Sequence, residues 1–153
     1  MLAGGTGNDS LLGSWGRDVL IGGEGADQLN NVTVANSDAG DDLLIAASTT
    51  WEKNYDPESN IANLNNLYDD YYGPLLAVWA GAGTFDQRVT KLSVTGFGTN
   101  NANKLTATTV LDDAAVDTLF GGAGTDWFFA HTSGSNLDTH DADATELAKL
   151  VQI

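Results

Sequence analysis

The stretch Gly4-Gly5-Thr6-Gly7-Asn8-Asp9-Ser10-Leu11-Leu12 decides the fold, because its nine-residue pattern returns along the chain. Two copies follow it without a gap, and three more start at Ser37, Asp112 and Gly121. In all six units the sixth residue is an aspartate and the eighth is large and apolar, which chance explains poorly. The sixth residues are Asp9, Asp18, Asp27, Asp42, Asp117 and Asp126, and the eighth residues are Leu11, Leu20, Leu29, Leu44, Leu119 and Phe128.

Each unit divides into a turn of six residues and a strand of three. Glycine in the turn permits positive φ and close backbone approach, so that carbonyl oxygens can point at a cation. The aspartate adds a carboxylate, and calcium takes about six to eight such oxygens at roughly 2.3–2.6 Å. The apolar eighth residue points into a core, since successive strand side chains alternate between faces. One unit cannot bury that face alone, so the units must stack.

The glycine positions hold less well than the aspartates. Units one, three and six are complete, whereas unit two has Ser14 in place of its second glycine. Unit four opens Ser37-Asp38 but keeps Gly40, and unit five, which starts at Asp112, has no glycine in its turn. Because Ala115 resists a left-handed turn, we expect unit five to be the poorest calcium site.

The pattern resembles the calcium-binding nonapeptide repeat, G-G-x-G-x-D-x-U-x, of RTX (repeats-in-toxin) hemolysin-type proteins. The resemblance covers residues 1–45 and 112–129. It implies a mainly β fold, a right-handed parallel β-roll with turns on alternate sides and ions between turns two units apart. Four Ca²⁺ sites are then expected, between units one and three, three and five, two and four, and four and six. The predicted calcium ligands are Gly4, Thr6, Gly7, Asp9, Gly13, Trp15, Asp18, Gly22, Glu24, Gly25, Asp27, Asp38, Gly40, Asp42, Asp117, Gly121, Ala123 and Asp126.

The repeats stop after Ile45, and the chain divides accordingly. We expect residues 1–45 and 112–130 to form the two parts of the roll, residues 46–111 a largely helical insertion and residues 131–153 a C-terminal cap.

Within the insertion, apolar residues at helical spacing predict a helix that ends near Tyr72, and a second that starts around Pro74. A capping-box pattern predicts a third from Thr84, and a strand is expected over 104–111. In the cap, Asp143 predicts a short helix reaching Val151. The first helical stripe is Ile61, Leu64, Tyr68, Tyr71, Leu75 and Val78.

Composition excludes several classes of partner. The 153 residues include 21 acidic and 6 basic side chains, a net charge of −15, which argues against nucleic acid and against anionic membrane surfaces. There is no cysteine, hence no disulfide or thiolate site. No apolar run reaches the about 18 residues of a membrane span. Since Met1 leads straight into a repeat, we expect the chain to be a fragment of a longer protein.

No catalytic constellation is visible, so we expect no enzyme. His140 lies among Asp138, Asp141 and Asp143, and we expect a solvated acidic loop there rather than a metal or acid-base site.

The RTX resemblance implies a calcium-binding module of a large secreted bacterial protein, extracellular or at the cell surface, that folds on calcium and aids export. Its partners would be calcium ions, upstream domains and an export or cell-surface partner. An adhesion module is the alternative, in which the insertion exposes Trp51, Tyr55, Tyr71, Tyr72 and Trp79.

Overall fold

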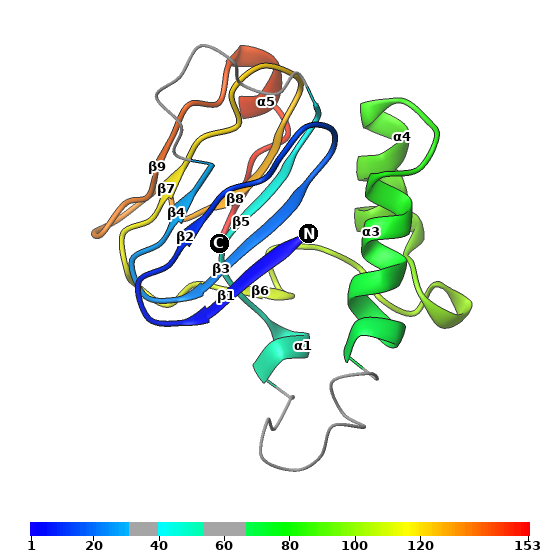
Figure 1. Ribbon diagram of the computed structural model, residues 1–153, viewed down its shortest axis with the longest axis horizontal. Helices are drawn as coiled ribbons and strands as arrows, with labels where there is room; N and C mark the ends of the chain where they lie inside the picture. Colours follow the sequence, from blue (N-terminus) through cyan, green and yellow to red (C-terminus); the bar gives the residue numbers. More distant parts are fainter. Residues whose placement is uncertain (31–39, 54–66) are drawn as a thin grey trace.

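Two sheets of short strands form the centre of the protein in the computed structural model, which describes residues 1–30, 40–53 and 67–153. Within each sheet the neighbouring repeat strands are parallel, and consecutive repeat strands alternate between the sheets (Figure 1). The first sheet has the order β1 (Leu2–Thr6), β3 (Val19–Glu24), β5 (Leu43–Thr49), β8 (Trp127–Ala130) and β10 (Val151–Gln152), and the second has the order β2 (Ser10–Leu11), β4 (Gln28–Leu29), β7 (Thr118–Leu119) and β9 (Thr139–His140).

The register of these sheets follows the nine-residue repeat. Leu29, the eighth residue of unit three, pairs with Leu11 of unit one and with Leu119 of unit five. In the first sheet, Leu44 of unit four pairs with Leu20 and Phe128 in the same way. Units one, three and five therefore lie on one side and units two, four and six on the other, as the resemblance implied. Unit five joins the stack although the insertion precedes it.

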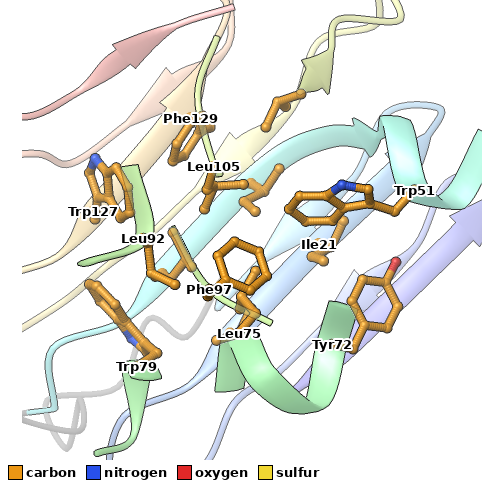
Figure 2. Packing of buried hydrophobic residues seen from close by; sticks show 14 of the residues in the cluster. Ile21, Trp51, Tyr72, Leu75, Trp79, Leu92, Phe97, Leu105, Trp127 and Phe129 are labelled. Atoms are coloured by element: carbon orange, nitrogen blue, oxygen red, sulfur yellow. The ribbon is translucent and has the colours of Figure 1, made fainter. Parts of the chain in front are cut away.

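Two hydrophobic cores share the first sheet. The inner core lies between the sheets and consists of the eighth-position residues with Ala46 and Ala130. The outer core lies between the first sheet and the insertion, whose helices α3 (Gly73–Trp79) and α4 (Phe85–Thr90) stand beside that sheet in Figure 1. Figure 2 shows Trp79 near Trp127, whose rings stack with 6.0 Å between centroids, in a cluster that also contains Ile21, Leu75 and Phe97. The three central strands of the first sheet, β3, β5 and β8, are therefore buried on both faces, whereas the edge strand β1 is largely exposed.

The insertion differs from its predicted helices at Pro74. A π-helical turn, η1 (Tyr68–Tyr72), runs directly into α3, and the N–H of Gly73 bonds to the carbonyl of Tyr68. Pro74 has no N–H to donate, and the wide turn before it lets the helix continue. The predicted boundary is confirmed, since η1 ends at Tyr72 and Pro74 lies in the first turn of α3, but the backbone stays helical across it. The predicted residues Ile61 and Leu64 lie outside the described residues.

The remaining elements of the insertion are short. Thr84 forms the predicted capping box at the start of α4. The strand expected over 104–111 is limited to its last two residues, because Thr106 and Thr109 hydrogen-bond to each other in a turn. The elements are α1 (Thr50–Lys53), η2 (Lys91–Thr95), η3 (Thr99–Asn101) and β6 (Val110–Leu111).

The two ends of the insertion meet in space. β6 pairs antiparallel with the end of β5, Ser48 opposite Leu111 and Thr49 opposite Val110. The chain therefore leaves the stack within the turn that leads to unit five and returns beside its point of departure.

The stack continues beyond residue 130, since β9 extends the second sheet and β10 the first. Between them Asp143 caps α5 (Ala144–Leu147) through a capping box with Glu146, as predicted. That helix ends at Leu147 rather than reaching Val151, because Val151 pairs with Phe129 in β10. In the part of the chain that the structure describes, no helix is both long and apolar enough to cross a membrane.

Candidate calcium sites in the repeat turns

The sixth-position residues form two hydrogen-bonded ladders. The backbone N–H of each donates to a carboxylate oxygen, Oδ1 or Oε1, of the corresponding residue two turns on, at 2.6 to 2.9 Å. The stack thus brings together carboxylates that are up to 90 residues apart in sequence. The odd side runs Asp9, Asp27, Asp117 and Asp138, and the even side runs Asp18, Asp42, Asp126 and Glu146.

The second carboxylate oxygen, Oδ2, of the sixth-position aspartate is in a different environment in the complete units and in the others. Oδ2 of Asp9, Asp27 and Asp126 is buried and has no hydrogen-bond partner. These aspartates belong to units one, three and six, the three with the full glycine pattern. A buried oxygen without a partner costs free energy, and a bound cation would supply that partner.

The first glycine of each complete unit lets neighbouring oxygen atoms approach the backbone closely beside that carboxylate oxygen. A side chain on Gly4 would collide with the carbonyl of Gly22 and with Oδ2 of Asp9, and one on Gly22 with the carbonyl of Ala46 and Oδ2 of Asp27. Carbonyl and carboxylate oxygens therefore converge where no side chain can enter. Calcium prefers such oxygen ligands, so these residues fit the ion.

Backbone oxygens must supply much of any such coordination shell. Among the described residues, no three His, Cys, Asp or Glu side chains gather around a common point. Gly25 and Gly124 lie close against the carbonyls of Gly7 and Gly40 on the neighbouring turns. The turns therefore present carbonyls along the stack.

In units two and four the same oxygens are already engaged, and in unit five a different carboxylate, that of Asp113, is engaged. Oδ2 of Asp18 accepts the N–H of Ser14 at 2.9 Å, the residue that replaces a glycine. Oδ2 of Asp42 accepts Nδ2 of Asn30 at 2.9 Å. In unit five, Asp113 accepts the N–H of Gly25 at 2.5 Å. Hydrogen bonds replace open coordination in these turns.

The other predicted ligands that the structure describes lie in the turns or at the ends of the strands that lead into them, and their role as ligands stays a prediction. The carbonyl of Glu24 accepts the N–H of Gly7 at 2.7 Å. The Trp15 side chain is 84% exposed, which leaves only its carbonyl as a ligand. In unit five the left-handed conformation falls on Ala114 instead of Ala115. Asp38 lies outside the described residues. Thr6 is the last residue of β1, and Gly13, Gly40, Asp117, Gly121 and Ala123 lie in the turns.

Burial changes the acidity of the ladder residues. It raises the pKa of Asp117 to about 7, with added repulsion from Asp138 and Asp27. It raises the pKa of Asp126 to about 8, helped by the negative charges of Asp42 and Glu146. The pKa values of Asp27 and Asp138 are raised for the same main reason. Ionised carboxylates are therefore costly here unless a cation accompanies them.

The calcium-free protein should therefore lose stability as pH rises from about 5 to 8.5. The folded state holds protons on Asp117 and Asp126 at pH values where the unfolded chain, with a pKa near 3.8, has released them. Calcium competes with those protons, so its stabilising effect should be larger at pH 8.5 than at pH 5. Thermal unfolding of metal-stripped protein at both pH values, with and without calcium, measures this. Calcium-free stability that increased with pH would contradict it.

Sequence reasoning missed a seventh unit, residues 133–141, which is the last unit on the odd side. Gly134 and Asn136 take positive φ at its second and fourth positions, and Asp138 occupies the sixth. The eighth position is His140, whose ring lies 5.9 Å from that of Phe128. The expected solvated loop is therefore wrong for Asp138, which is buried. The spacing of Gly134 and Asp138 was the available signal, but a histidine replaces the apolar residue.

Stacked strands joined by aspartate-lined turns define a repeat protein with candidate cation sites in its turns. Comparison with known families finds four copies of the RTX calcium-binding nonapeptide repeat, over residues 1–29 and 109–132. These stretches are RTX repeats, and they imply Ca²⁺ as the bound ion. No curated protein and no solved structure matches the chain.

Proposed function

We propose that this chain is a calcium-dependent folding module of a larger secreted protein, and that its two sheets form a right-handed parallel β-roll. The observation that carries the proposal is the set of buried Oδ2 atoms of Asp9, Asp27 and Asp126 that have no partner. The RTX repeats support calcium as the ion. We expect ions at turns one, three and six. In this proposal the module acts through folding and carries no catalysis.

Calcium would act by offsetting two costs of folding. Ordering the glycine-rich turns costs backbone entropy, and stacking the carboxylates adds repulsion to a chain of net charge −15. At the dissociation constants of extracellular calcium modules, roughly 10⁻⁴–10⁻³ M, the sites would stay empty inside a cell and fill outside it. The loose chain would suit passage through an export channel, and calcium outside would then drive folding.

A calcium titration of metal-stripped protein tests the proposal. We expect far-UV circular dichroism and tryptophan fluorescence to change together, near millimolar calcium, because Trp79 of the insertion is buried against Trp127 of the first sheet. Magnesium is the control, since it demands shorter, octahedral coordination and should not replace calcium. A stripped protein that is already fully folded and binds no calcium would overturn the proposal.

The adhesion alternative receives no support from the described aromatic residues. Trp51, Tyr72 and Trp79 are buried, and Tyr71 stacks on Trp51 with 5.3 Å between ring centroids. Tyr55 lies outside the described residues. Tyr68 is exposed, but the other described aromatic side chains of the insertion pack in the outer core against the first sheet, so we propose a structural role for the insertion.

A further inference from the structure

The side chain of Asn30 spans two neighbouring turns on the even side. Its Oδ1 accepts the N–H of Gly13 in unit two at 2.7 Å, and its Nδ2 donates to Oδ2 of Asp42 in unit four at 2.9 Å. Asn30 is buried and takes a φ of 56°, which asparagine tolerates better than most residues. Its amide therefore connects a turn backbone with a ladder carboxylate.

The engaged oxygen of Asp42 corresponds to the one that is left without a partner in complete units. Oδ2 of Asp9 and of Asp27 each lies against the first glycine of its own turn and has no partner. At Gly13, the corresponding space adjoins both Oδ2 of Asp18 and Oδ1 of Asn30. The Asn30 amide thus lies between turns two and four, where the repeat pattern would otherwise bring oxygens around an ion.

The chemistry of an amide suits it to take the place of a cation between these two turns. Its N–H supplies a positive dipole end to the Asp42 carboxylate, while its oxygen satisfies a backbone donor that a cation would leave open. The amide carries no net charge, so it fastens the two turns without depending on the calcium concentration.

We propose that Asn30 is a built-in substitute for calcium between turns two and four, and that it excludes an ion from this position. The inference rests on the proposed function, since it takes the other turns to bind calcium. It distinguishes the turns that ions would hold from turns two and four, which a neutral side chain joins.

Replacing the amide by a carboxylate tests the proposal. Asn30→Asp places a second acid beside Asp42 at a φ that aspartate also tolerates. We expect one more bound calcium ion per chain than in the wild type, counted by native mass spectrometry and calorimetric titration. The melting temperature should fall without calcium and recover when calcium is saturating. Asn30→Gly, which keeps the φ and deletes the amide, should also gain an ion and guards against misfolding of the first variant.

Asn100→Asp is the matched control, because Asn100 has a φ of 57° and is exposed in the insertion. It should change neither the ion count nor the calcium dependence of the melting temperature. If the wild type binds calcium but neither Asn30 variant gains an ion, the proposal about Asn30 is overturned and the proposed function stands. If the wild type binds no calcium, the proposed function itself fails.

Discussion

Asp27→Asn should abolish much of the stabilisation that calcium gives, while leaving the calcium-free protein as stable as before or more so. The asparagine keeps an oxygen for the N–H of Asp9, which Asp27 accepts at 2.7 Å. It removes the charge of a buried carboxylate whose pKa burial has raised. Each site held at ten times its dissociation constant contributes about 1.4 kcal/mol. Asp27 belongs to turn three and bonds to the backbone of turn one. Both turns are expected to hold ions, so we expect a loss of about 3 kcal/mol in the presence of calcium.

Chemical unfolding with and without calcium measures both halves of this result. Asp86→Asn is the control, because Asp86 is an exposed acid on α4 away from the turns. It should leave the calcium-dependent difference in the free energy of unfolding unchanged. If Asp27→Asn lowered stability equally with and without calcium, Asp27 would serve the fold alone and would not be a calcium ligand.

Arg88→Met should destabilise the folded protein by about 3 kcal/mol, whatever the calcium concentration. The guanidinium of Arg88 is 2% exposed, bonds to the carboxylate of Asp41 and lies 5.1 Å from the ring centre of Trp79. Methionine fills similar space but removes the closer charge partner of Asp41. The remaining partner is Arg17, whose Nε is 3.8 Å from the Asp41 carboxylate. Asp41 also accepts the N–H of Thr125 and, through its carbonyl, the indole N–H of Trp79. The pair therefore joins the insertion to turns four and six.

Lys149→Met is the matched control for Arg88→Met. Lys149 pairs with Asp86 on the same helix α4 at 3.0 Å, but both side chains are exposed. Exposed pairs contribute at most about 1 kcal/mol, so the change should be small. Urea unfolding of the two variants, followed by tryptophan fluorescence, compares them directly. Equal effects of the two substitutions would show that burial of Arg88 contributes nothing.

The sequence also indicates which of the two sheets the insertion covers. In units two and four, the residues on either side of the eighth-position residue are apolar, as in Val19 and Ile21. In units one, three and five the residue before it is polar, as in Ser10, Gln28 and Thr118. This contrast marks the sheet that the insertion covers. It becomes interpretable only once the units are known to alternate between two sheets.

Other features depend on contacts that local patterns do not encode. The backbone stays helical from η1 into α3 because a π-helical turn precedes Pro74. Nothing nearby in the sequence specifies that turn. Asn30 looks like an ordinary strand end until Gly13 and Asp42 are placed beside it. Asp138 and Glu146 end the ladders through backbone groups about 20 residues away in sequence. The aspartate positions were predictable, whereas the partners of their second oxygens were not.

The antiparallel pairing of β5 with β6 has a consequence for how stacked repeats of this kind can accept insertions. Because the two ends of the insertion are adjacent, the strands before and after it remain neighbours whatever its length. Closing a longer loop costs only about 0.6 kcal/mol for each doubling of its length. A turn of this kind is therefore a permissive point at which evolution, or a protein engineer, can place a separate folding unit. The nine-residue repeat in the sequence would be interrupted there, while the stack of strands would continue.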